Sequence, residues 1–280
     1  MLKRLKHRLL LIKWLISQKK SNFDFVAEAF ISVAARWHGE IDPIRTYLAM
    51  FSVLRLANFK GRIVEFGGGY STVFASGFIN IAIKDITSVD FNPSKYDRIL
   101  NSSRNAERFL SGINSKPRVS VTLQEVHESL QALLTFLDAN QGLVLSASLA
   151  RFGYKKDFEL NQLSQDFTSH PSYKMETGFY SKFDAVSGSG FCREIIEEKL
   201  QFDAYFFDCG EISSIAEFWL LKDHMKNGDF VLLHDIYYPK SIKNFLVACY
   251  LCVDPDWKVI FEDNSSAQGG LVARKVVGKQ

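Results

Sequence analysis

The chain of 280 residues is 47% hydrophobic and 23% charged, which is typical of globular proteins and allows one large α/β domain or two small ones. Residues 1–20 hold seven of the 34 Lys and Arg residues and no acid, so the rest of the chain is mildly acidic. This charge distribution argues against a nucleic-acid-binding face. The cysteines lack the spacing of a disulfide framework, which favours a reducing compartment, the cytoplasm; they are Cys192, Cys209, Cys249 and Cys252.

The basic N-terminus is expected to form a separate helix over residues 1–21. Its apolar stretch, Leu9 to Ile16, is only eight residues long and is interrupted by Lys13. A membrane-spanning helix takes about 20 apolar residues, and no cleavage site of a signal peptide follows. We favour a solvated or partner-packed helix, since charge runs are usually solvated. Peripheral contact with an anionic membrane surface is the alternative.

Residues 22–59 are expected to form two helices, and strands and helices alternate from residue 62 to the end. Asp42-Pro43 is a good helix start, with Asp as the N-cap and Pro in the first turn. Apolar runs that carry β-branched residues mark short strands. The expected helices are 22–38, 42–59, 71–80 and 94–110, and the expected strands are 62–66 and 85–90.

The middle of the chain, residues 111–181, is expected to be an insertion or cap within a domain that spans residues 22–280. Residues 118–123, RVSVTL, alternate like a strand, and residues 127–138 read as a helix. Residues 150–180 show no clean period and are crowded with aromatic side chains. Packing in a core or cap is the default for these aromatics, and a lid over a bound molecule is the alternative.

The final hundred residues return to a regular alternation. Helices are expected over 191–200, 212–226 and 240–253, and strands over 202–208 and 229–235. WKVIFED and GGLVARKV then form two antiparallel strands. The sequence therefore predicts a Rossmann-like α/β fold with a mostly parallel seven-stranded sheet, helices on both faces and a final antiparallel hairpin. Ligands bind such sheets at the carboxyl ends of the strands, where Glu65, Asp90, Asp208 and His234-Asp235 gather.

The glycine-rich stretch RIVEFGGGYSTVFAS follows the first of these strands. Thr72 stands where a dinucleotide fingerprint has its third glycine, and the GK[ST] of a phosphate loop is missing. The segment Glu65-Phe66-Gly67-Gly68-Gly69 has an acid, one residue and then GxG. This pattern resembles motif I of class I S-adenosylmethionine-dependent methyltransferases. An acid suits a cationic sulfonium ligand, and glycines let the backbone pass close to it. The resemblance implies that the donor is bound by Glu65, Gly67, Gly68, Gly69, Ser71 and Asp90, with Asp90 accepting hydrogen bonds from the ribose hydroxyls.

The second half resembles the small-molecule and sugar O-methyltransferase branch, the macrocin type, through FDAYFFDCG and LKDHMKNGDFVLLHD. The resemblance implies that Asp208 and Asp235 hold a divalent metal, usually magnesium, which would lower the pKa of an acceptor hydroxyl. The branch commonly has a histidine three residues after the first of these acids, and this chain has Glu211 there. Glu211 or His234 is therefore the candidate general base.

These features predict an enzyme that transfers a methyl group from S-adenosylmethionine to a hydroxyl of a small molecule or glycan. Related enzymes often associate, so a homo-oligomer is an option. Two alternatives stay open. Glu211 in place of histidine allows a non-catalytic interaction module of the same fold, and the atypical glycine loop allows a nucleotide-dependent oxidoreductase.

Overall fold

The computed structural model describes residues 42–69, 71, 72, 75, 83–90, 113–116, 119–187, 190–264 and 266–276. The expected helices over 1–21, 22–38 and 94–110 lie outside the described residues. Of the expected helix over 71–80, only Ser71, Thr72 and Ala75 are described, and all three are helical.

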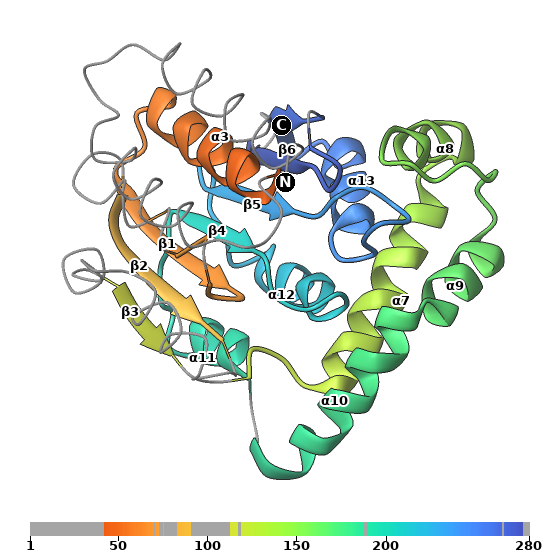
Figure 1. Cartoon of the computed structure of the whole chain (residues 1–280), viewed down its shortest axis with the longest axis horizontal. Coiled ribbons are helices and arrows are strands. Elements are labelled where there is room, and N and C mark those ends of the chain that lie inside the picture. Colours follow the sequence, from red (N-terminus) through yellow and green to blue (C-terminus); the bar gives the residue numbers. More distant parts are fainter. Residues whose placement is uncertain are drawn as a thin grey trace, which may run out of the picture.

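A seven-stranded sheet in the order β3-β2-β1-β4-β5-β7-β6 forms the centre of the molecule (Figure 1). Neighbouring strands from β3 to β5 pair in parallel, and β7 pairs antiparallel with both β5 and β6. This topology confirms the predicted fold class, including the final antiparallel hairpin. The strands are β1 (Gly61–Phe66), β2 (Ile83–Val89), β3 (Ile113–Lys116), β4 (Ala204–Phe207), β5 (Phe230–His234), β6 (Trp257–Asp263) and β7 (Gly270–Lys275).

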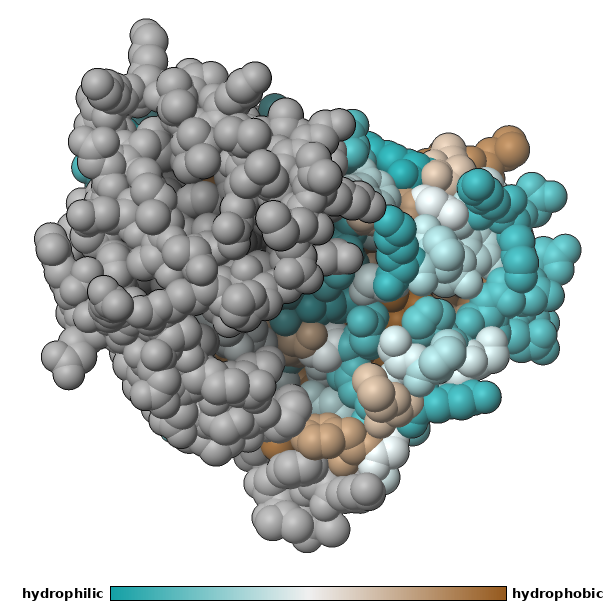
Figure 2. Space-filling model, in the orientation of Figure 1, coloured by the Kyte–Doolittle hydropathy of each residue, from teal (hydrophilic) through white to brown (hydrophobic). Residues whose placement is uncertain are grey.

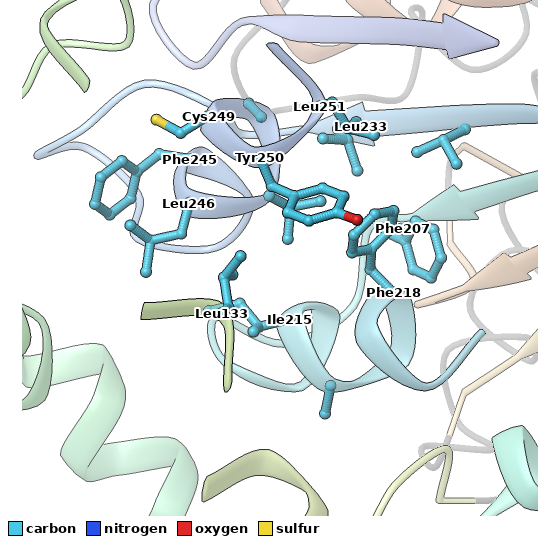
Figure 3. Close-up of a cluster of buried hydrophobic side chains, with 14 of the residues drawn as sticks. Leu133, Phe207, Ile215, Phe218, Leu233, Phe245, Leu246, Cys249, Tyr250 and Leu251 are labelled. Carbon is cyan, nitrogen blue, oxygen red and sulfur yellow. The ribbon is translucent and has the colours of Figure 1, made fainter. Parts of the chain in front are cut away.

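Helices cover both faces of this sheet. Successive side chains of a strand point to opposite faces, so the neighbours Phe206 and Phe207 of β4 identify them. The ring of Phe206 packs edge-on against Phe51 of α3 (Asp42–Leu56), whereas Phe207 packs against Phe218 of α12 (Ser213–Leu221). Tyr250 of α13 (Phe245–Val253) also contacts Phe218, which places α13 with α12 opposite α3 (Figure 3).

Helices α7 to α11 lie between β3 and β4 in the chain: α7 (Leu123–Ala139), α8 (Gly142–Arg151), α9 (Leu160–Ser169), α10 (Pro171–Ser187) and α11 (Phe191–Glu197). These helices and their connections contribute buried side chains to the core that α12 and α13 form with the sheet, among them Phe152, Tyr154, Phe167 and Tyr180. The default expectation of core packing is therefore confirmed for these four aromatics. The domain boundaries at residues 22 and 111–181 stay a prediction.

The expected strand over 118–123 is wrong. Thr122 instead caps α7, because its hydroxyl accepts from the Glu125 N–H while the Glu125 carboxylate accepts from the Thr122 N–H. This reciprocal capping box fixes a helix start at Leu123 and prevails over a short alternating pattern. The third strand lies earlier, at Ile113–Lys116, and pairs with β2.

The described surface in Figure 2 is mostly hydrophilic over α8 to α10, with hydrophobic patches. Helix α8 carries two exposed apolar side chains, Leu143 and Val144. Within the described ranges, no helix has the length and apolar character to cross a bilayer. All four cysteines are unpaired.

Candidate functional site

The glycine loop begins at Gly67, where strands β1, β2 and β4 come together. Gly67 has a φ of +91°, a conformation that glycine adopts readily and other residues rarely do. Its N–H donates to the carbonyl of Val89 at 2.8 Å. A Cβ at this position would lie only 2.3 Å from the main-chain oxygen of Asp208. The turn therefore requires glycine both for its dihedral angle and for the close approach of β4.

Gly69 of the same loop differs from Gly67 in its surroundings. A Cβ built at Gly69 meets no heavy atom of the described residues within 4 Å. The Gly69 N–H donates to the Thr72 hydroxyl at 2.9 Å, which turns the chain into the following helix. The Thr72 hydroxyl thus holds the backbone at Gly69. Among the described residues, no atom lies close to the side where a side chain would project.

Glu65 lies beneath the loop as a buried carboxylate that accepts three hydroxyl groups. Ser71 and Thr72 each donate at 2.5 Å, and Ser88 of β2 donates at 2.8 Å. Burial raises the pKa of Glu65 to about 7, against the opposing effect of these hydrogen bonds. The side chain that the sequence predicts as a donor ligand therefore holds the start of the next helix to β1 and β2.

Asp90 follows the last residue of β2 and is 4% exposed. Phe66 of β1 is paired with Val89 of β2, so Gly67 and Asp90 follow neighbouring strand ends. The predicted donor residues Glu65, Gly67 and Asp90 thus occupy one edge of the sheet.

A second group of charged side chains lies at the ends of β4 and β5. The His234 Nδ1 atom is 3.2 Å from Asp208 Oδ1 and 3.2 Å from Asp235 Oδ1. The Lys243 ammonium lies 2.6 Å from Asp208 Oδ1 and 3.2 Å from Asp235 Oδ2. We call these four residues, Asp208, His234, Asp235 and Lys243, the charge cluster. All four are largely buried, with the Lys243 residue only 6% exposed.

Mutual attraction fixes the charged forms of these residues. Burial alone would lower the pKa of Lys243 and raise those of the two carboxyls, but the opposite charges outweigh it. The pKa of Lys243 is raised, that of Asp208 lies well below its usual range and that of Asp235 is also lowered. Burial likewise opposes the charged form of His234, yet Asp208 and Asp235 raise its pKa to about 9. At neutral pH the cluster therefore holds two negative and two positive charges.

The loop over residues 235–244 carries Lys243 back to the strand ends. Asp235 turns the chain with a φ of +63°. The Asn244 side-chain amide donates to the carbonyls of Phe207 at 3.0 Å and of His234 at 2.6 Å, which ties the loop to both β4 and β5. The N–H of Lys243 donates to the Ser241 hydroxyl at 3.1 Å. Lys243 therefore has a fixed backbone position.

Glu211, one of the two predicted general bases, holds this loop from the side. Its carboxylate accepts from the Ser241 hydroxyl at 2.9 Å and from the Ile242 N–H at 3.1 Å. No hydrogen bond or ion pair joins Glu211 to the charge cluster among the described residues. The other candidate, His234, lies within the cluster, and its Nε2 atom is buried without a hydrogen-bond partner in the described part of the chain.

Sequence reasoning missed Lys243 and Tyr47. The Tyr47 hydroxyl of α3 donates to Asp208 Oδ2 at 2.7 Å, and its ring lies 4.7 Å from that of His234, centroid to centroid. Lys243 carried a signal in the sequence, since it stands just before Asn244, the N-cap of a strongly apolar helix. A cation at a helix N-terminus opposes the helix dipole and needs nearby acids. Tyr47 carried no comparable signal, because its contact joins residues 161 positions apart.

The residues fit a divalent metal poorly, although Asp208, His234 and Asp235 each place a ligand atom within 4.8 Å of the others. Magnesium is held by oxygen ligands, commonly one or two carboxylates with water. Here one oxygen of each carboxylate already accepts the Lys243 ammonium, which has no lone pair to offer a metal.

No protein-family model matches the chain, and no curated protein matches it. Similar solved structures include an O-methyltransferase from Bacillus cereus in complex with S-adenosylhomocysteine, at 10% identity over 94% of this chain and 96% of that chain, with a TM-score of 0.49. An O-methyltransferase from Streptomyces achromogenes involved in tomaymycin synthesis, in complex with S-adenosylmethionine, is 12% identical over 95% of both chains, with a TM-score of 0.45. A ribosomal-protein methylase from Lactobacillus delbrueckii subsp. bulgaricus is 10% identical over 85% of this chain and 81% of that chain, with a TM-score of 0.43. At these identities and TM-scores, the matches carry no conclusion about this chain.

Proposed function

We propose that this chain is a class I S-adenosylmethionine-dependent methyltransferase that acts on a hydroxyl group of a small molecule or glycan. The observation that carries the proposal is the contact between the glycine loop and the charge cluster. Gly67 packs against the main chain of Asp208, so the loop after β1 adjoins the charged residues after β4 and β5. A methyl transfer requires this arrangement, because the donor and the acceptor must meet in line within one site.

In this proposal the donor lies over the open backbone at Gly69, with Asp90 accepting hydrogen bonds from its ribose hydroxyls. Gly67 and Gly68 shape the loop, and Glu65 with Ser71 keeps the loop against the sheet. Glu65 therefore acts as a positioning residue, since in the described structure its carboxylate accepts hydrogen bonds from three hydroxyls of the chain.

The acceptor hydroxyl would lie against the charge cluster. Its oxygen would take the methyl group as the bond from that carbon to the donor sulfur breaks, and the hydroxyl proton would pass to the deprotonated form of His234. His234 is the cluster residue proposed to contact the acceptor, because its Nε2 atom lacks a hydrogen-bond partner among the described residues. With a pKa of about 9 it is a hydrogen-bond donor at neutral pH and accepts a proton only in its deprotonated form. Glu211 is assigned a positioning role through the loop at Ser241.

Incubation with S-adenosylmethionine carrying a labelled methyl group and a panel of phenols, catechols and sugars tests the transfer. The proposal expects label in at least one hydroxyl compound and formation of S-adenosylhomocysteine. His234→Gln should lower the rate at least tenfold while donor affinity stays within a factor of three, because His234 is assigned to the acceptor. Donor binding without transfer to any compound of the panel would favour the non-catalytic interaction module.

The oxidoreductase alternative receives no support from a particular residue. A dinucleotide fold is expected to continue with parallel strands, whereas β7 runs antiparallel to β5. The predicted homo-oligomer, the cytoplasmic location and a role for residues 1–20 at a membrane surface stay predictions from the sequence.

A further inference from the structure

We propose that the Lys243 ammonium takes the place of a divalent metal between Asp208 and Asp235, so that methyl transfer by this chain needs no metal. The catalytic part of this inference, transfer without a metal, rests on the proposed function. Its structural part, the exclusion of a metal by Lys243, can be tested without any methyl donor.

The position of the ammonium is the first support. Nζ donates to Asp208 Oδ1 at 2.6 Å and to Asp235 Oδ2 at 3.2 Å, and so bridges the ends of β4 and β5. These are the two carboxylates that the resemblance to metal-assisted O-methyltransferases assigns to the metal. A lysine and a divalent ion therefore compete for the same oxygens.

The fixed backbone around Lys243 is the second support. Asn244, the next residue, donates to the carbonyls of Phe207 and His234, and Ser241 binds both the Lys243 N–H and Glu211. The lysine enters the cluster from a loop that is tied to Phe207, His234 and Glu211, and it is almost fully buried. A mobile surface lysine would have neither property.

The balance of charge is the third support. The two carboxylates already face the Lys243 ammonium, which offsets part of their negative charge. A divalent cation would add two positive charges beside that ammonium, at separations where like charges repel strongly in a poorly hydrated site. It could bind only if Lys243 left, and a buried charge that loses its partner is costly.

An ammonium can perform part of the work of a metal. It supplies a positive charge that stabilises developing negative charge on an acceptor oxygen, and it has three N–H donors, of which two serve Asp208 and Asp235. Unlike a metal ion, the ammonium cannot dissociate, because it is covalently attached to the chain. The rate of transfer should therefore depend on Lys243 and be insensitive to chelators.

The decisive experiment measures Mn²⁺ binding by electron paramagnetic resonance in the full-length chain, without methyl donor. The wild type should bind Mn²⁺ no more tightly than Lys240→Ala, a control at an exposed lysine of the same loop. Lys243→Ala should bind Mn²⁺ at least tenfold more tightly than the wild type, and Lys243→Ala combined with Asp208→Asn should lose that gain. Saturating Mn²⁺ should also raise the melting temperature of Lys243→Ala by about 5 °C and leave that of the wild type unchanged.

Tight Mn²⁺ binding by the wild type that disappears in Asp208→Asn would overturn the proposal, and this outcome needs no lysine variant to fold. A folded Lys243→Ala that gains no Mn²⁺ affinity would overturn it as well, since the carboxylates would then be no latent metal site. Failure to bind a methyl donor would instead reject the proposed function, and the metal titrations would remain valid.

Discussion

Gly67 and the main-chain oxygen of Asp208 lie so close that a single added carbon on Gly67 would come within 2.3 Å of it. The Asp208 N–H donates to the carbonyl of Phe66 at 2.9 Å, so strands β1 and β4 remain paired up to this point. The contact joins the glycine loop to the charge cluster. A change in the loop at Gly67 should therefore disturb both halves of the proposed site.

Gly67→Ala should destabilise the protein by about 2–4 kcal/mol, since it adds left-handed backbone strain to a steric overlap with main-chain atoms. Gly69→Ala is the matched control, because its Cβ would meet no heavy atom of the described residues within 4 Å. Its free energy of unfolding should stay within about 1 kcal/mol of the wild type. Urea denaturation followed by circular dichroism compares the two. Equal stability of both variants would refute the close approach at Gly67.

Glu65→Ala should lower the free energy of unfolding by about 2–4 kcal/mol, because Ser71, Thr72 and Ser88 lose a shared buried acceptor. Donor affinity should fall at least tenfold in the same variant, as the loop loses its anchor. Ser88→Ala removes one of the three donors and should cost about 1 kcal/mol. Denaturation and calorimetric titration measure the two effects. If Glu65→Ala binds the donor normally, the positioning role is wrong.

Tyr47→Phe should destabilise the protein by about 1.5–3 kcal/mol, the usual range for a hydrogen bond to a charged group. The lost bond is the one from Tyr47 to Asp208, which connects α3 to the end of β4. Tyr173→Phe serves as the control, since no side-chain hydrogen bond of Tyr173 is present in the described structure. Thermal unfolding of the two variants should show a lower melting temperature for Tyr47→Phe alone.

Glu217 predicts a pH dependence of stability away from the site. It is fully buried on α12 and accepts from Ser120 and Cys209. Burial raises its pKa from 4.5 to about 7. A carboxyl with a raised folded-state pKa stabilises the fold fully below pH 4.5, and this contribution is lost as the pH rises through about 7.

Glu217→Gln keeps an oxygen acceptor and removes the titration. Relative to the wild type it should therefore gain stability between pH 4.5 and pH 8, by roughly 3 kcal/mol at most, since one pKa unit corresponds to about 1.4 kcal/mol. Glu65 titrates in the same range but is present in both proteins, so its effect cancels. Urea denaturation at several pH values measures the difference. A difference that is independent of pH would contradict the buried, shifted carboxyl.

The sequence predicted most of the sheet, because buried parallel strands leave uninterrupted apolar runs such as FDAYFFD and DFVLLHD. Strand β3 could not be predicted, since INSK is short, polar and without alternation. The edge that gathers Glu65, Asp208 and His234 was predictable for a general reason. Parallel strands end on the same side of a sheet, so acids at strand ends must approach one another.

The chemical role of these residues depended on contacts that no spacing reveals. Glu65 looked like a ligand and turned out to hold three hydroxyls of its own chain. Glu211 looked like a base and holds a loop. The partner of Asp208 and Asp235 is Lys243, which reaches them only because Asn244 closes the loop over residues 235–244 onto two strand ends.

Isothermal titration with S-adenosylhomocysteine tests the central claim most directly. The proposed methyl-donor site at Gly67, Gly69 and Asp90 predicts binding at micromolar concentration to one site per chain, and at least tenfold weaker binding in Asp90→Ala. NADH, titrated in parallel, should give no heat of binding. Absence of S-adenosylhomocysteine binding at millimolar concentration, or equal affinity in the wild type and Asp90→Ala, would contradict the account.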